Sequence, residues 1–482
     1  MKKIDTDVIV VAAGPSGLAA AATAAENGAR VTVFEKANTV GGAANMGMGP
    51  LGIGTKAQKD MMVDMDVEKA FKMFMEYTHW RVDANMVKKY FENSASTIAW
   101  LEDMGVEFAG AYKYFPKSEA TWHIVAVNGG IGRNGGAIMN KAIMDYAKEN
   151  GAEFHLETPV EKLIKEDGKV VGVMAKGPDG EEIEARGKAV IICTGGAGDN
   201  PEMIHELTGY TFREDMFNFA IPGLKGEGMK MAWEAGAARG EVNFEMIYIL
   251  PHSDMGPDCV PAVFMQPNLM VNQMGERFIN EEQMQNTTFT GNAIACQKGK
   301  VGYAILDASI VRHYKKNGVD VANFVHHPES VADFDDVVEQ YVKEGNPDVY
   351  KADTLEELAG KIGIDPEKLQ ETVDEYNEMC ESADTRFYKP RNFMRPIKKG
   401  PFYAGKFRPG AYGTLGGIKI NTRGEVLDPD WNPIPGLYAA GTDTCEIYGD
   451  SYMFLLPGNT MGYCLNTGRF AGESAADYAL DQ

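Results

Sequence analysis

A short turn near the N-terminus contains residues that could bind a phosphate group. It runs through Ala13, Gly14, Pro15 and Ser16 and ends at Gly17. Gly14 lets the backbone approach a pyrophosphate, and Gly17 lets a helix pack closely on a strand. The N–H groups and positive dipole end of the following helix would complete the anion site. The turn therefore predicts dinucleotide binding, although taken alone it could also join an ordinary buried strand and helix.

Two neighbouring features extend this prediction. Glu35 lies about 20 residues beyond the turn, where an acid can accept hydrogen bonds from a ribose diol. A second run of glycines begins at Gly41 and continues to Gly49. A nicotinamide site needs no such run, whereas a long cofactor with an isoalloxazine ring along the backbone does. Ala12 replaces the first glycine of the GxGxxG pattern, which leaves the phosphate approach intact but makes the motif less specific.

A C-terminal segment combines titratable and apolar side chains. Tyr412 precedes a glycine run, and Asp450 and Tyr452 precede the apolar residues 453–456. Such a lining favours an apolar, aromatic or polycyclic molecule with a few polar groups. An acid beside an apolar pocket is suited to acid–base catalysis, a role that Asp450 could take. Alternatively, the apolar residues cover a cofactor or a domain interface, Tyr412 is a packed tyrosine and Asp450 faces solvent.

These residues need elements that hold them in place. Hydrophobic patterning predicts strands at 7–12 and 30–34, joined by an alanine-rich helix that ends near residue 27. This βαβ unit puts the turn at the helix N-terminus. Helices are also predicted over 65–104, 137–150 and 366–381, a β-meander over 159–165, 170–175 and 182–185, and a strand over 189–193. Glycines become sparse between about 240 and 410, which indicates an inserted domain.

The composition excludes several classes of function. A chain of 482 residues is long enough for two or three domains. Its net charge of −22 repels nucleic-acid phosphates and anionic lipids, so we expect no nucleic-acid or membrane partner. Six cysteines without paired spacing indicate reduced thiols, and no run of about 18 apolar residues could span a membrane. Because the N-terminus also lacks a signal-peptide pattern, we expect a cytoplasmic protein.

Five sequence blocks resemble a known family. They are the N-terminal turn with 35–36 and 41–42, and the stretches 189–196, 275–281, 413–422 and 435–441. In this order they resemble the flavoprotein subunits of fumarate reductase and succinate dehydrogenase, in the branch that includes 3-ketosteroid dehydrogenases and urocanate reductases. The resemblance implies an α/β fold. A two-part Rossmann-like FAD-binding domain, 1–240 and 411–482, would carry an α+β capping domain at 241–410.

The resemblance also implies which residues bind FAD. The pyrophosphate would be faced by Ala13, Gly14, Pro15 and Ser16. The adenosine end would lie near Glu35, Lys36, Val160, Thr194 and Gly195. The residues that would line the ring are Gly41, Gly42, Ala43, Ala44, Met48 and Gly49. The residues that would approach the ring and the ribitol from the C-terminal part are Gly441, Asn459, Thr460 and either Thr442 or Asp443. All eight histidines lie at residue 79 or beyond, so the FAD should be noncovalent.

Missing arginines narrow the substrate class. Family members that act on fumarate or succinate hold the dicarboxylate with arginines and histidines, whose geometry suits carboxylates. This chain has no arginine from 278 to 311 or from 424 to 468. His252 resembles a family substrate histidine, but it could equally be a packed residue of the cap. By resemblance to the ketosteroid branch, Tyr412 and Tyr452 would share proton transfer.

We therefore expect an FAD-dependent oxidoreductase that exchanges hydride between flavin N5 and a neutral, largely apolar phenolic or polycyclic molecule, in the reductive direction. The pattern is similar to gut-bacterial flavoproteins that reduce plant phenolics, in particular the equol-forming tetrahydrodaidzein reductases. Loss of a benzylic hydroxyl can pass through a quinone methide, which needs a base for the phenol and an acid for the departing water. Electrons would come from NAD(P)H or a redox partner protein. The alternatives are a 3-ketosteroid-type dehydrogenase, an enoate or fumarate-like reductase with an altered substrate, and a flavin-bound electron carrier.

Overall fold

The two ends of the chain share one sheet. The computed structural model describes residues 1–321, 325, 328 and 330–481. The sheet has the strand order β18-β19-β11-β2-β3-β7 and is parallel except at its β18-β19 edge. Its strands are β2 (Val8–Val11), β3 (Val31–Phe34), β7 (Glu153–His155), β11 (Ala189–Ile192), β18 (Glu425–Leu427) and β19 (Pro433–Ala439). The predicted βαβ unit is confirmed, and β19 pairs with β11 from the far end of the chain.

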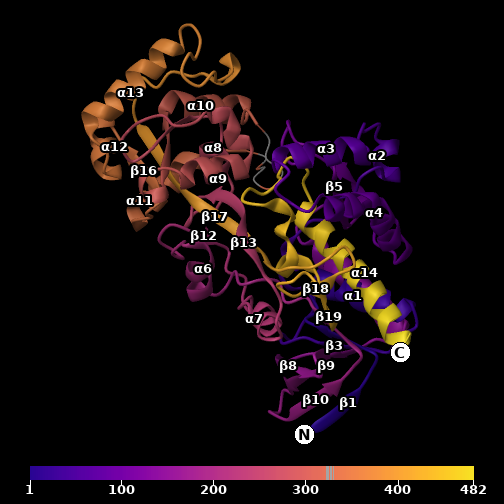
Figure 1. The fold of residues 1–482 in the computed structure, drawn as a ribbon. Helices are drawn as coiled ribbons and strands as arrows, with labels where there is room; N and C mark the ends of the chain where they lie inside the picture. The colour runs from indigo at the N-terminus through magenta and orange to yellow at the C-terminus, as the bar shows by residue number, and fades with distance from the viewer. Residues whose placement is uncertain (322–324, 326–327, 329, 482) are drawn as a thin grey trace.

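Two helices lie side by side against this sheet. They are α1 (Pro15–Glu26), which follows the N-terminal turn, and α14 (Asn459–Leu480), which ends the chain (Figure 1). Small residues allow the close approach, because a Cβ on Gly468 would clash with the carbonyl oxygen of Ser16. The start of α14 is thereby held next to the start of α1, although more than 400 residues separate them in the sequence.

A second sheet lies at one end of the molecule, beside the N-terminus (Figure 1). Its order is β1-β10-β9-β8, and the predicted meander is confirmed as its last three strands. The strands are β1 (Lys2–Asp5), β8 (Val160–Glu166), β9 (Lys169–Lys176) and β10 (Glu182–Arg186).

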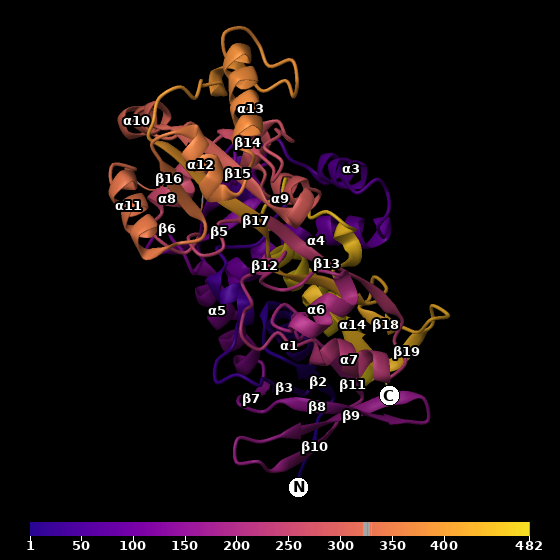
Figure 2. The ribbon, with the colours of Figure 1, turned by 90° about the vertical axis from the view of Figure 1, so that its left-hand side faces the viewer.

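The long strand β17 (Phe402–Ile418) connects this FAD-binding part to the cap (Figure 2). It pairs with β12 (Phe217–Asn218), β13 (Arg239–Ile249), β15 (Gly302–Asp307) and β16 (Val349–Ala352), and β14 (Leu269–Val271) lies beyond β15. The cap helices are α8 (Cys259–Phe264), α9 (Thr287–Ala295), α10 (Ala308–Asn317), α11 (Phe334–Glu344), α12 (Leu355–Ile362) and α13 (Pro366–Met379). The boundary that we placed at residue 410 falls inside β17.

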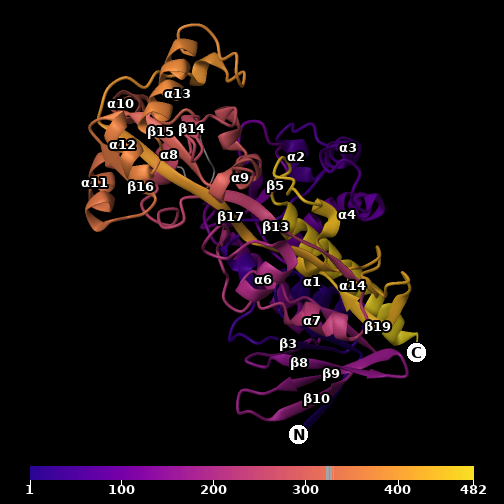
Figure 3. The same ribbon diagram turned by 60° about the vertical axis from the view of Figure 1, so that its left-hand side comes forward.

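The remaining elements are α2 (Lys56–Asp60), α3 (Val67–Tyr77), α4 (Ala84–Asp103), β4 (Phe108–Tyr112), β5 (Trp122–Val127), β6 (Gly130–Ile131), α5 (Gly135–Glu149), α6 (Pro201–Thr208) and α7 (Glu227–Glu234). Of these, α4 packs on α14, whereas α6 and α7 lie beside β13 and β8, respectively (Figure 3). Tyr90 on α4 joins Tyr448 and Tyr463 in one buried aromatic core. No helix in the described part of the chain is long and apolar enough to cross a membrane.

Candidate functional site

The predicted phosphate turn leaves its backbone open where a ligand would lie. Ala12 has a φ of 76°, and a Cβ on Gly17 would clash with the Ala12 carbonyl oxygen, so the chain turns sharply between β2 and α1. A Cβ on Gly14, in contrast, would meet no atom of the described residues within 4 Å. Gly14 is the N-cap of α1, and no side chain caps the helix there. The first N–H groups of α1, near Pro15 and Ser16, are therefore available to an anion.

Glu35 holds the turn from the end of β3. Its two carboxylate oxygens accept hydrogen bonds from the backbone N–H groups of Ala13, at 2.7 Å, and Ala37, at 2.8 Å. Each oxygen keeps a further lone pair, which the predicted ribose contact would use. The ammonium of Lys36 lies 2.7 Å from a carboxylate oxygen of Glu227, so its side chain is already paired.

The second glycine run lies against the first. The N–H of Gly41 donates to the Ala13 carbonyl at 2.8 Å, and a Cβ on Gly42 would be 3.8 Å from the Cα of Gly14. Val160 begins β8 next to Thr158, whose N–H donates to the Glu35 carbonyl at 2.9 Å. Beyond Gly42, Ala43 is exposed and Ala44 is half-buried, whereas Met48 and Gly49 are buried.

Asp443 fixes a third turn, at the end of β11. Its carboxylate accepts hydrogen bonds from the backbone N–H groups of Thr194 at 2.6 Å, Gly195 at 3.0 Å and Gly196 at 2.8 Å, and from the Thr194 hydroxyl at 3.0 Å. Asp443 is fully buried, and this burial raises its pKa although the hydrogen bonds oppose the rise. Thr442 is half-buried beside it. Of the two residues left open by the sequence, Thr442 is thus the one with a side chain free to contact a ribitol.

The start of α14 carries an unsatisfied polar group. Asn459 is fully buried, its side-chain oxygen accepts from the Tyr448 hydroxyl at 2.8 Å, and its carbonyl accepts from the Tyr90 hydroxyl at 2.8 Å. Its Nδ2 finds no partner among the described residues. A Cβ on Gly441 would clash with Ser16, which brings this region onto the phosphate turn.

The three turns and the orphaned amide fit FAD. An unpaired buried donor is costly unless a ligand supplies an acceptor. The backbone groups at Gly14 suit a pyrophosphate, and the Asn459 amide suits a polar edge of the flavin. The residues present therefore suit the predicted cofactor.

Glu245 is a candidate site residue that the sequence reasoning missed. It lies on β13, and the hydroxyls of Tyr452 and Thr460 are near enough to interact with its carboxyl. Burial raises its pKa from 4.5 to about 7, an effect that the two hydroxyls partly oppose. The residue as a whole is half-buried. A lone acid in an otherwise apolar strand, 244–250, is the signal that could have identified it.

Two predicted tyrosines face the same interior. Tyr452 is buried, and its hydroxyl accepts from the Thr460 hydroxyl at 2.9 Å. Tyr412 stacks on Phe219 with ring centroids 5.3 Å apart and interacts with the Tyr114 hydroxyl. Tyr412 keeps 37% exposure, and burial of its hydroxyl raises its pKa well above 10.

Asp450 and His252 lie elsewhere. The Asp450 side chain is 70% exposed and lies 3.1 Å from Arg81, so it lacks the apolar surroundings that we expected. The His252 ring is 54% exposed and lies 3.1 Å from the buried Asp348. Neither side chain is brought together with Tyr412 and Tyr452.

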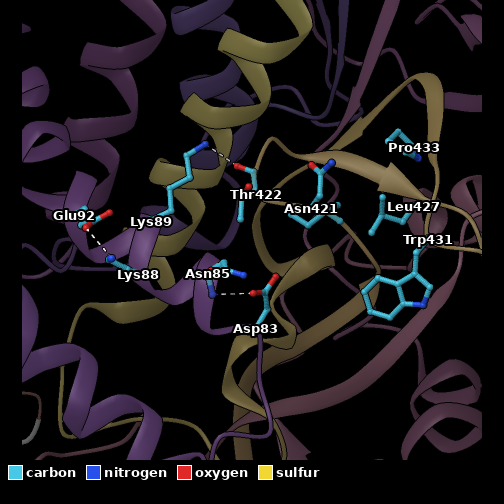
Figure 4. Close-up of a pocket in the computed structure, with 11 residues that line it drawn as sticks. Asp83, Asn85, Lys88, Lys89, Glu92, Asn421, Thr422, Leu427, Trp431 and Pro433 are labelled. Carbon is cyan, nitrogen blue, oxygen red and sulfur yellow. Dashed lines mark hydrogen bonds and ion pairs between the residues drawn. The ribbon is translucent and has the colours of Figure 1, made fainter.

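A surface pocket of about 630 Å³ lies between α4 and the β18 region (Figure 4). Its lysines are already engaged, since Lys88 pairs with Glu92 and Lys89 donates to the Thr422 carbonyl at 2.7 Å. The pocket shares no lining residue with the predicted cofactor or substrate sites, so it is not the candidate site.

Comparisons with known proteins agree with the predicted cofactor. The model of the FAD binding domain family matches residues 7–460. The vinyl phenol reductase of Lactiplantibacillus plantarum is 32% identical, over 99% of this chain and 97% of its own length. A flavocytochrome c3 fumarate reductase in an open conformation has a TM-score of 0.71 and 28% identity, covering 99% of this chain and 79% of that one.

A steroid enzyme has a similar fold. The 3-ketosteroid-Δ4-(5α)-dehydrogenase of Rhodococcus jostii RHA1 has a TM-score of 0.77 at 24% identity, covering 99% of this chain and 98% of that one. At this identity, the likeness concerns the fold alone.

Proposed function

The chain belongs to the FAD binding domain family, as an FAD-dependent oxidoreductase related to fumarate reductases, and from this premise we propose that it reduces a neutral phenolic substrate. The observation that carries the proposal is the aromatic and acidic character of the side chains at the candidate site. Tyr412 stacks on Phe219, Tyr452 lies in a buried aromatic cluster, and the Glu245 carboxyl acts on both tyrosines, whereas a dicarboxylate would need cations. The similar protein from L. plantarum is named for reducing a vinyl phenol, a neutral phenolic alkene.

The tyrosines suit a phenol. The partly exposed Tyr412 is held in place by stacking on Phe219. Because burial keeps its pKa well above 10, it stays protonated and can donate a hydrogen bond to a phenolate oxygen. Tyr452 and the apolar residues near it would pack on the aromatic ring.

The proposed chemistry uses the phenol to activate the substrate. The phenol proton passes to water, and protonation of the terminal alkene carbon then gives a quinone methide whose benzylic carbon accepts a hydride. The phenolate that results takes a proton back from water. FAD, when bound and reduced, supplies that hydride. Loss of a benzylic hydroxyl as water gives the same kind of intermediate, so a tetrahydrodaidzein-like substrate that yields equol is the second candidate.

The electrons need an external source. We propose NAD(P)H or a redox partner protein as donor, because the sequence contains no haem motif and no second dinucleotide fingerprint. Flavin reduction measured with each nicotinamide separates the two sources.

The function is tested by reducing the purified holoenzyme under anaerobic conditions and adding one candidate oxidant at a time. The panel contains 4-vinylphenol, tetrahydrodaidzein, an unsaturated 3-ketosteroid and fumarate. We expect fast flavin reoxidation with a phenolic compound and slow reoxidation with fumarate. Reoxidation by fumarate alone would refute the proposal, and turnover of the steroid alone would favour the dehydrogenase alternative.

A further inference from the structure

Glu245 has the placement of an acid that acts on a ligand. It lies on β13, opposite Tyr452 and Thr460, and both of these belong to the region that approaches the predicted flavin ring. The Thr460 hydroxyl donates to the Tyr452 hydroxyl at 2.9 Å, so the two groups form a fixed pair beside the carboxyl. The carboxyl therefore lies at the start of α14, where Asn459 carries the amide left unpaired in the described part of the chain.

The groups around Glu245 stay neutral near pH 7. The titratable groups on which the charge of Glu245 acts come from β17, from the 445–452 segment and from α14, namely Tyr412, Cys445, Tyr448, Tyr452 and Cys464. Burial raises the pKa of each of these groups, that of Cys464 to about 12. Glu245 is thus the group of this set that gains or loses a proton at physiological pH.

We propose that Glu245 is the catalytic proton donor of this enzyme and that it protonates the substrate carbon next to the one that receives hydride. This role rests on the function proposed above. A proton donor is needed from another part of the chain, because no arginine occurs between 278 and 311. The pKa of about 7 means that a large fraction of the carboxyl is protonated at neutral pH, as a general acid requires.

The step balances with the reduced cofactor as reductant. The O–H bond of the Glu245 carboxyl breaks, a C–H bond forms at the terminal carbon of the alkene, and the two electrons of the hydride complete the reduction at the neighbouring carbon. The carboxylate that remains recovers a proton from water. Tyr452 and Thr460 act as positioning residues, because they hold the carboxyl by hydrogen bonding rather than touching the reacting atoms.

The test compares Glu245→Gln with the matched control Glu241→Gln. Glu241 is exposed on the same strand and belongs to no part of the proposed site. The reduced holoenzymes are mixed with 4-vinylphenol, and flavin reoxidation is followed in a single turnover from pH 5 to pH 9. Loss of a general acid slows such a step by about 10² to 10⁴-fold. We expect this loss in E245Q, with flavin content and reduction by dithionite unchanged, and the wild-type rate in E241Q.

A second readout does not depend on activity. In the infrared spectrum of the oxidised holoenzyme, the band of a protonated carboxyl should disappear as pH rises through about 7, and it should be absent from E245Q. The wild-type rate should fall over the same pH range, since the acid form is the donor. Glu245→Asp keeps an acid and should recover part of the rate that E245Q loses.

The outcomes separate the two proposals. If wild type reduces 4-vinylphenol and E245Q keeps its rate and pH profile, Glu245 is not the proton donor and the phenolic function stands. If the infrared band persists in E245Q, the titrating carboxyl is a different one and the assignment is likewise overturned. If wild type reduces no phenolic compound, the proposed function fails and the assignment fails with it.

Discussion

At the scale of single residues, two buried carboxylates near the predicted flavin have different surroundings. Asp443 accepts four hydrogen bonds from the 194–196 turn, so its role is to hold backbone in place. Glu245 interacts with two hydroxyls, and the residue is half-buried. Only the second carboxyl is placed to exchange a proton with a ligand.

The raised pKa of Glu245 predicts a cost to stability that depends on pH. Between pH 4.5 and about 7 the unfolded chain releases this proton while the folded protein retains it, so stability falls as pH rises through that range and then levels off. The rise in the Glu245 pKa corresponds to about 3 kcal/mol. E245Q should lack this loss, so its free energy of unfolding should exceed that of wild type by more at pH 8 than at pH 4.5. Urea denaturation at both pH values measures the difference, and an equal difference at both would contradict it.

Tyr412 gives a prediction for the substrate contact. Tyr412→Phe keeps the ring stacked on Phe219 but removes the hydroxyl. A lost hydrogen bond to the phenol oxygen corresponds to about 1 to 2 kcal/mol, so kcat/KM for 4-vinylphenol should fall about 10-fold. Tyr388→Phe, at a surface position of the cap that is 79% exposed, serves as the control and should change nothing. Steady-state kinetics check both variants, and an unchanged kcat/KM in Y412F would remove Tyr412 from the proposed site.

Residue roles were harder to predict than residue types. The apolar run at 453–456 suggested a pocket beside Asp450, but Asp450 points outward to Arg81 while Tyr452 points inward. Sequence adjacency does not tell which way a loop side chain faces. Glu245 was missed because its partners, Tyr452 and Thr460, come from a segment about 200 residues away and meet β13 only in the folded protein.

At the scale of elements, the turn between β2 and α1 contains one glycine that the fold requires and another that ligand binding would require. Gly17 is needed for the close packing of α1 on the Ala12 carbonyl, whereas Gly14 faces open space. Both glycines belong to one motif, yet Gly17 serves helix packing and Gly14 leaves room for a ligand.

Substituting each glycine by alanine should give different defects. Gly17→Ala places a Cβ onto backbone, which should destabilise the protein by about 1 to 3 kcal/mol. Gly14→Ala should leave the free energy of unfolding of the FAD-free protein nearly unchanged but should weaken FAD binding, because the Cβ enters the space expected for the pyrophosphate. Thermal denaturation and FAD titration of both variants test this. Normal FAD affinity in G14A would contradict the proposed phosphate site.

Regular elements were the most predictable feature. The helix α13 was expected over 366–381 and is found at Pro366–Met379, because Asp365 caps it and Pro366 starts it. The long β17 was not anticipated, since a glycine-rich stretch does not read as a strand. Pairing with β12 and β13 at 410 and 416, and with β15 and β16 at 405, explains how glycines can lie within a strand that other elements approach closely.

At the scale of the whole molecule, the FAD-binding part and the cap have separate cores joined by β17. The cap core contains a buried ionic cluster. The guanidinium of Arg277 lies 2.7 Å from Glu281 and 2.8 Å from Asp384, and Lys389 lies 3.6 Å from Glu281. All of these side chains are almost fully buried, so the cluster depends on every member being paired.

Breaking this cluster should weaken the cap. Arg277→Gln leaves two buried carboxylates with too little compensating charge, which should cost about 3 to 5 kcal/mol. Arg386→Gln removes an exposed pair with Glu375 and should change stability by less than about 1 kcal/mol. Chemical denaturation compares the two variants, and hydrogen exchange should show the loss of protection in the cap. Equal stability of R277Q and wild type would contradict the structural role of the cluster.

The central claim, that this flavoprotein reduces a neutral phenolic molecule rather than a dicarboxylate, is tested most directly by competition. The reduced holoenzyme is given 4-vinylphenol and fumarate together at equal concentration under anaerobic conditions, and the products are quantified. Our account predicts that 4-ethylphenol forms while the fumarate remains. Formation of succinate with the 4-vinylphenol left unchanged would contradict it.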